Sequence, residues 1–228
     1  MAKPKVIAKA DEIRNSVKAE LAYDPAIEAS DITVKNMGGD VALNGTVPSY
    51  PQYLRAAEAA RRVQGVTGVH NHLMVTLPLD SYRDDIQLTT AANNALAQNV
   101  TLPKTLEASA SDGDVWITGW VSHGTQRNDA ELAIAPLVGV RGIVNDITVT
   151  HDTADAGDTV ARVDDALKRY GWFDDDSAIN VEAQAGTITL TGHVTTWTEH
   201  DAAIQAAWMG EGVREVRDQV LVTAGDYW

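Results

Sequence analysis

The chain has 228 residues, enough for one or two ordinary domains or for three small ones, and 44% of them are hydrophobic. It contains no cysteine, which excludes disulfides, thiolate nucleophiles and cysteine-based zinc sites. Its net charge of −14 disfavours nonspecific binding to nucleic acid or to an anionic membrane.

The N-terminal segment is basic, since residues 1–9 carry three lysines and no acidic residue. It has no apolar run of the kind that a signal peptide needs. No stretch of the chain approaches the roughly 20 apolar residues that span a bilayer. These features predict a cytoplasmic protein.

Two short blocks of sequence recur three times. The first block reads GGDVALNGTV (38–47), DGDVWITGWV (112–121) and AGTITLTGHV (185–194). The second reads GVTGVHNHLMV (65–75), GVRGIVNDITV (139–149) and GVREVRDQVLV (212–222). Because the spacing between the blocks is constant, we expect three tandem domains at residues 10–78, 83–150 and 157–224. LPLDSY (77–82) and HDTADAGD (151–158) would be the linkers.

The same elements are expected in each repeat, in the same order. Each repeat opens with a helix whose apolar residues recur every four positions. These residues are Ile13, Val17 and Leu21, then Leu88, Ala92 and Leu96, and then Val160, Val163 and Leu167. A strand, a tight turn and a second alternating strand follow, and then an alanine-rich helix and a last strand. The order αββαβ predicts an α+β fold, with two helices on one face of a three-stranded mixed sheet.

Two sets of glycines recur at fixed places in the repeat. Gly45, Gly119 and Gly192 fall inside the second strand on its core side, which indicates a bulge or a helix lying close to the strand. Gly65, Gly139 and Gly212 follow the second helix, where they would form its C-terminal stop.

The repeat resembles the BON domain family, in a V-x-L-x-G-x-V strand and a later G-V-x-x-V-x-N strand. Val41, Leu43, Gly45 and Val47 match the first pattern, and Gly65, Val66, Val69 and Asn71 match the second. In the third copy, Glu215 and Asp218 depart from it. The resemblance implies a bacterial, non-enzymatic module associated with phospholipid membranes, osmotic stress and macromolecular assembly.

Trp116 and Trp120 are candidate binding residues. They alternate with Val115, Ile117 and Val121, so they point away from the predicted core. The first and third repeats place small or polar residues there instead. The pair could pack against a neighbouring domain, form an interface with another protein or a second copy, or enter a lipid surface.

Arg55, Arg61 and Arg62 are further candidates, on the second helix of the first repeat. Arg55 and Arg62 are seven residues apart and therefore share a helix face. They form either an ordinary solvated helix surface or a contact for anionic lipid or an acidic partner.

Other motifs predict little chemistry. GVTG (65–68) and GVRG (139–142) match a nucleic-acid-binding loop, but they stand between a helix and a strand, so we interpret them as turns and expect no nucleic-acid partner. His70 and His72 share a strand face, but no third ligand is visible, so no metal site is predicted. HDTADAGD and FDDDS (173–177) do not match a calcium loop. No catalytic motif or cofactor fingerprint is present, so we expect no enzyme and no cofactor.

Three functions remain as hypotheses. The first is an interaction module for membrane phospholipid or for an envelope-associated assembly under stress. The second is a cytoplasmic cation sensor, which the resemblance suggests could bind potassium. The third is a structural protein that assembles with itself as a homo-oligomer.

Overall fold

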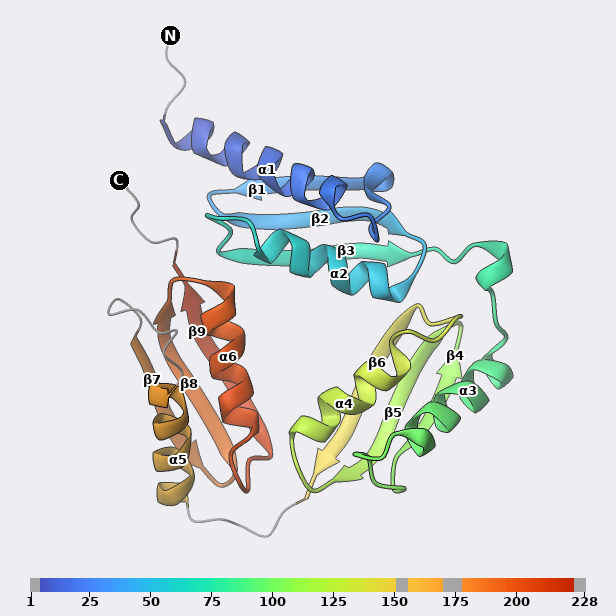
Figure 1. Cartoon of the computed structure of the whole chain (residues 1–228), viewed down its shortest axis with the longest axis vertical. Helices are drawn as coiled ribbons and strands as arrows, with labels where there is room; N and C mark the ends of the chain where they lie inside the picture. Colours follow the sequence, from blue (N-terminus) through green and yellow to red (C-terminus); the bar gives the residue numbers. More distant parts are fainter. Residues whose placement is uncertain (1–4, 151–155, 170–177, 224–228) are drawn as a thin grey trace.

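The computed structural model describes residues 5–150, 156–169 and 178–223, which form three α+β domains joined end to end (Figure 1). Each domain has two α-helices and one three-stranded sheet, so the predicted fold is confirmed. None of the helices in the described ranges is long and apolar enough to cross a membrane.

The elements of each domain follow the order αββαβ. The first domain comprises α1 (Lys5–Tyr23), β1 (Ile32–Met37), β2 (Asp40–Val47), α2 (Tyr50–Arg61) and β3 (Gly68–Val75). The middle domain comprises α3 (Asp85–Gln98), β4 (Glu107–Ser111), β5 (Asp114–Val121), α4 (Thr125–Ile134) and β6 (Gly142–Val149). The third domain comprises α5 (Ala156–Arg169), β7 (Ala178–Gln184), β8 (Thr187–Val194), α6 (Trp197–Trp208) and β9 (Glu215–Val222). Short 3-10 helices at Ala29–Asp31 and Leu79–Ser81 precede β1 and α3.

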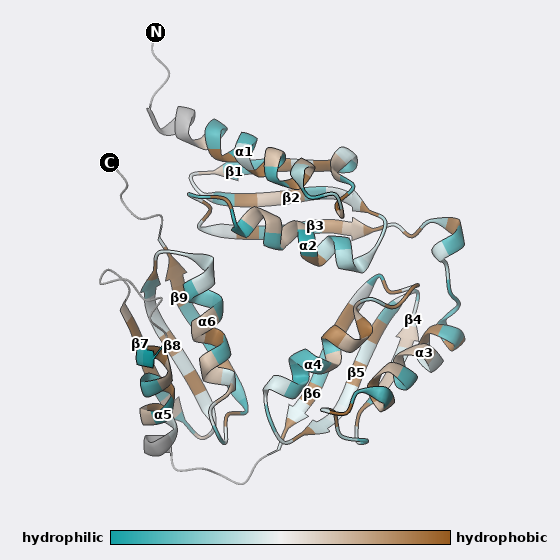
Figure 2. Cartoon of the chain, in the orientation of Figure 1, coloured by the Kyte–Doolittle hydropathy of each residue, from teal (hydrophilic) through white to brown (hydrophobic). Residues whose placement is uncertain are grey.

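The three sheets share one topology. The first two strands of each form an antiparallel hairpin, and the third strand pairs in parallel with the second. A parallel return needs a crossover connection, which the second helix supplies. The helices therefore lie over one face of the sheet, and brown, hydrophobic residues run along the strands (Figure 2). We call the opposite face of each sheet its open face.

The core of each domain lies between the sheet and its two helices. The inward residues of each middle strand are almost completely buried: Val41, Leu43 and Val47; Val115, Ile117 and Val121; Ile188, Leu190 and Val194. The predicted apolar positions of α1 and α3 are buried as well. In α5, however, Thr159 replaces Val160 at the first buried position, because it is four residues before Val163 and so shares its helix face. Its hydroxyl donates to the Glu211 carbonyl oxygen at 3.1 Å.

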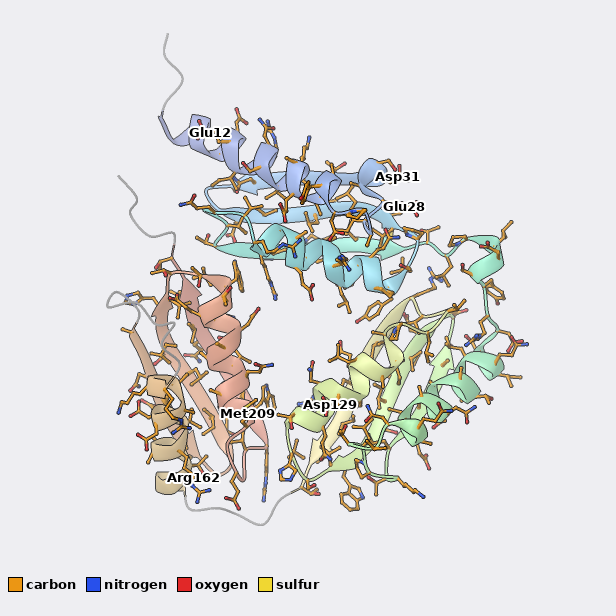
Figure 3. The ribbon with its side chains drawn as sticks, in the orientation of Figure 1. Glu12, Glu28, Asp31, Asp129, Arg162 and Met209 are labelled. Atoms are coloured by element: carbon orange, nitrogen blue, oxygen red, sulfur yellow. The ribbon has the colours of Figure 1, made fainter. Side chains whose placement is uncertain are left out.

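The backbone that leads into the first strand, not an α-helix, lies close to the glycines inside the middle strands. Gly45 has a φ of 127°, and a Cβ there would lie 1.9 Å from the carbonyl oxygen of Asp31. Asp31 precedes β1 and lies at one end of the first sheet (Figure 3). Gly119 and Gly192 meet the backbone of Thr105 and Ala178 in the same way. The chain entering the first strand therefore crosses directly over the glycine.

The second set of glycines lies beyond the helices. The helices α2, α4 and α6 end at Arg61, Ile134 and Trp208, a full turn before Gly65, Gly139 and Gly212. The expected helix stop is therefore wrong by about one turn. These glycines have φ values of 87°, 101° and 77°, so they serve the turn into the last strand.

A polar side chain ties the last strand of each domain to its second helix. Asn71 donates to the Tyr53 carbonyl oxygen at 2.8 Å, and Asn145 donates to that of Arg127 at 2.8 Å. Asp218 takes this position in the third domain, with a carboxylate oxygen 2.9 Å from Nε2 of His200. The asparagine of the repeat motif therefore has a structural role.

The three domains lie at the corners of a triangle, with α2, α4 and α6 on its inner side (Figure 1). The start of each inner helix contacts another inner helix toward its end. Tyr50, which begins α2, lies near Glu131 of α4, whose charge helps to raise the pKa of the tyrosine. Gly124, before α4, lies against Trp208 of α6, and Trp197, which begins α6, contacts Arg61 of α2. The domains therefore contact one another in a closed head-to-tail cycle.

The three interfaces differ in character. One buried apolar cluster spans the first and middle domains, whereas the third domain has a cluster of its own. Trp208 packs against both clusters. Burial and the nearby Glu131 raise the pKa of Tyr50 to about 12. The contact between the third and first domains is the polar one, with Arg61 of α2 beside Trp197 and Asp201 of α6.

Candidate functional site

The candidate tryptophans lie on β5, on the open face of the middle sheet. Trp120 is 52% exposed and Trp116 is half-buried. Val144 of β6 pairs with Trp116 and is 39% exposed. A neighbouring domain therefore does not cover this face at Trp120. The expectation that the tryptophans pack against another domain of the chain is wrong for this residue.

Three carboxylates share this face with the tryptophans. Glu107 of β4 and Asp146 of β6 both pair with Thr118, the residue midway between the two tryptophans on β5. Asp114 begins β5 on the same face. All three are exposed. We call the surface made by Trp116, Trp120, Val144, Glu107, Asp114 and Asp146 the tryptophan face.

The candidate arginines lie in the first domain and not beside the tryptophans. Arg55 Nε lies 2.7 Å from a carboxylate oxygen of Asp24, and Arg62 Nε lies 3.0 Å from one of Glu20. The hydrogen bond from Arg55 holds the pKa of the Asp24 carboxyl below its ordinary value. Arg55 of α2 therefore connects this helix to Asp24, which follows α1, and Arg62, which lies just beyond the end of α2 and not on it as predicted, connects it to α1.

Arg61 lies at the interface between the first and third domains. Its guanidinium stands 4.6 Å from the centre of the Trp197 ring, and Nη1 is 4.0 Å from a carboxylate oxygen of Asp201. The Trp197 indole donates to the Val66 carbonyl oxygen at 3.0 Å. A cleft of about 920 Å³ lies beside these contacts, with Glu12 of α1 among its lining residues (Figure 3).

His200 couples the third domain to this interface. Its Nδ1 lies 3.1 Å from Asp201 and its Nε2 lies 2.9 Å from Asp218. Its ring also meets Trp197 edge to face, with 5.0 Å between the centres. Burial alone would lower the pKa of His200, but the hydrogen bond to Asp201 and the charges of Asp218 and Asp201 together raise it.

This shift predicts a pH-dependent stability of the third domain. A pKa raised on folding adds stability that is complete below the unfolded value of about 6.5 and lost as the pH rises through the folded value. We expect His200→Gln to lower the melting temperature more at pH 5.5 than at pH 8.5. Calorimetry at several pH values measures this, with His193→Gln on the open face of the third domain as control. An equal loss at both pH values would contradict the assignment.

The remaining motifs lie apart from the tryptophan face. The rings of His70 and His72 stack at 6.3 Å, and His70 Nε2 is 3.6 Å from a carboxylate oxygen of Asp40. Among the described residues, no group of three or more histidine, aspartate or glutamate side chains is placed to hold a metal ion. GVTG (65–68) lies where α2 turns into β3. FDDDS (173–177) lies outside the described residues, as does most of HDTADAGD.

Apart from Arg61, sequence reasoning missed the residues that join the domains. Tyr50, Gly124 and Trp197 occupy one position of the repeat, and Arg61 and Trp208 occupy another. Comparing the three second helices position by position would have identified both as variable in size. The carboxylates of the tryptophan face were also missed, although strand alternation alone places them there.

Comparisons with known proteins agree with the repeat. The model of the BON domain family matches residues 9–76, 84–151 and 155–224. Osmotically-inducible protein Y of Escherichia coli strain K12 is 30% identical over 140 residues, which cover 59% of this chain and 70% of that protein.

Two solved structures match this chain over most of its length. One is CdsD, a structural protein of the Type III secretion system of Chlamydia trachomatis, with 14% identity over 93% of this chain and 92% of that one. The other is the C-terminal domain of CdsD, with 14% identity over 98% of this chain and 100% of that one. Both have a TM-score of 0.26, which is too low to support any conclusion.

Proposed function

Because this chain belongs to the BON domain family along all three of its domains, we propose that it is a non-enzymatic binding protein that docks on phospholipid surfaces. The predicted family is thereby confirmed, and its association with phospholipid membranes motivates the choice of ligand. The similarity to osmotically-inducible protein Y extends the proposal to a role in osmotic stress.

The observation that carries the proposal is the exposure of Trp120 on the open face of the middle sheet, near the end of its central strand. An indole has an apolar ring and one polar N–H, which suits the boundary between lipid headgroups and acyl chains. Trp116 and Val144 extend this apolar strip across two strands. The arginines are left out of the docking surface, because Arg55 and Arg62 are engaged in ion pairs within the first domain.

Replacing the exposed indoles tests the proposal directly. We expect the wild-type protein to float with vesicles that mix zwitterionic and anionic phospholipids, and Trp116→Ser/Trp120→Ser to lose at least about tenfold in bound fraction. The loss follows because much of the apolar area available to the lipid is gone. Co-flotation followed by quantitative gel analysis measures it.

The matched control removes exposed apolar side chains from another open face. Met37 and Met74 of the first domain are 85% and 65% exposed, so Met37→Ser/Met74→Ser should float like the wild type. Equal flotation of wild type and the tryptophan variant would refute the docking surface. The cation-sensor, self-assembly and cytoplasmic assignments stay predictions.

A further inference from the structure

We infer that the tryptophan face binds zwitterionic phospholipid headgroups through their ammonium groups, and that it disfavours anionic lipid. This inference rests on the proposed function and names the lipid class that the same surface takes. It is carried by the carboxylates that stand among the tryptophans.

The strand register brings carboxylates and rings together. Glu107, Thr118 and Asp146 form one row across the three strands, with the rows of Trp116 and Trp120 on either side of it. At about 3.3 Å per residue, the two tryptophans are roughly 13 Å apart along β5. At about 4.8 Å per strand, Glu107 and Asp146 flank Thr118 and lie roughly 10 Å from each other. A cation near Thr118 therefore has a carboxylate on each neighbouring strand and a tryptophan two residues away in each direction along β5.

The charge of this face is of one sign. Among the described residues of β4, β5 and β6, none on the open face is a lysine or an arginine. Three carboxylates repel the phosphates of an anionic surface, but they attract the ammonium that a zwitterionic headgroup presents outermost. Tryptophan adds to this attraction, since ammonium groups bind well over its ring.

The same combination is missing from the described open faces of the other two domains. The positions equivalent to Glu107 and Asp146 are Thr33 and His72 in the first domain, and Asn180 and Gln219 in the third. The positions equivalent to the tryptophans are Ala42 and Thr46, and then Thr189 and His193. Tryptophan rings and a pair of flanking carboxylates thus occur together on the described open face of the middle domain, and the described open faces of the other two domains lack both.

A basic protein segment offers similar cations, but the geometry favours a bilayer. The tryptophan face lies on an open sheet, and both indole rings contribute partly exposed surface. A bilayer presents a plane of closely spaced, identical ammonium groups, so several of them can contact the tryptophan rings and the carboxylates at the same time.

Vesicles of single composition test the inference. We expect wild-type protein to bind phosphatidylcholine vesicles at least about tenfold more tightly than phosphatidylglycerol vesicles. Glu107→Gln/Asp146→Asn should lose about tenfold toward phosphatidylcholine and gain toward phosphatidylglycerol. Asp40→Asn/Glu182→Gln makes the same change of net charge in the other two domains and should keep the wild-type preference.

The outcomes separate this inference from the proposed function. Tighter binding to phosphatidylglycerol overturns the inference and leaves phospholipid docking intact. Binding to neither vesicle overturns both. If the protein binds neither kind of vesicle but its tryptophan face binds an oligolysine peptide, the face belongs to a protein partner. That result would also overturn both the inference and the proposed function.

Discussion

Replacing Gly45 with alanine is expected to unfold the first domain while the other two domains remain folded. The glycine has a φ of 127°, a conformation that residues with a side chain rarely adopt. A Cβ would also stand 1.9 Å from the Asp31 carbonyl oxygen, far inside contact distance. Relief of this overlap would require β1 to move away from β2, and the hairpin hydrogen bonds would be lost.

The expected loss is comparable to the stability of the domain. Backbone strain at such a position costs about 1–3 kcal/mol, and forced separation of packed backbone adds about 1–3 kcal/mol more. A domain of this size has on the order of 4–10 kcal/mol in total. Because the first and middle domains share one apolar cluster, the middle domain should lose part of its stability too.

Gly38 provides the matched control. It also has a positive φ, of 71°, but a Cβ there would meet nothing within 4 Å. The third domain carries Ala185 at the equivalent position with a φ of 50°, so alanine is compatible with this turn. Gly38→Ala should therefore cost only about 1 kcal/mol.

Hydrogen exchange followed by mass spectrometry measures both variants, because it reports each domain separately. Gly45→Ala should remove protection from β1 and β2 and leave β7 and β8 protected. If Gly45→Ala and Gly38→Ala lose the same protection, the contact with Asp31 is not what the glycine accommodates.

The fold was predictable because the same sequence pattern occurs three times in the chain. A helix period in one segment and a strand period in the next recur at fixed spacing, and each copy supports the reading of the others. Local details were less accessible. Gly45 was correctly placed on the core side of a strand, but the neighbour that requires it is a backbone carbonyl 14 positions earlier. Sequence periodicity cannot show where a backbone crosses.

The candidate site was predictable only in part. Strand alternation places Trp116 and Trp120 on the open face, and the structure agrees. It does not tell whether another domain covers that face. The arginines were chosen by charge and helix spacing alone, and their partners Asp24 and Glu20 come from a different element. Ion pairs between elements depend on packing that a helix pattern does not contain.

The contacts between domains were the least predictable part of the structure. The same position of the repeat is occupied by Tyr50, Gly124 and Trp197. Which side chain fits there depends on the residue that faces it from the neighbouring domain. Trp208 needs a neighbour without a side chain, and Gly124 provides one. A repeat alignment shows that the sizes vary but not which residue faces which.

A substitution at Gly124, which faces Trp208 across the interface between the middle and third domains, is also expected to have a large effect on the structure. Gly124 has an ordinary helical conformation, with φ of −60° and ψ of −33°, so alanine causes no backbone strain there. Its Cβ, however, would lie 2.2 Å from Cε3 of Trp208. The other two repeats carry Tyr50 and Trp197 at this position, so the fold of the repeat accepts a large side chain there. The glycine is therefore required by the neighbouring domain and not by its own.

We expect Gly124→Ala to separate the third domain from the middle one at a cost of about 2–3 kcal/mol to the interface, with each domain still folded. Small-angle scattering should show a larger radius of gyration, and circular dichroism should be unchanged. Reducing the ring in the same protein, as Gly124→Ala/Trp208→Leu, should restore the compact form, because leucine leaves room for the new methyl group. A compact Gly124→Ala protein would show that the indole can move aside, and that the arrangement of the domains rests on the polar contacts of Arg61 and Trp197 instead.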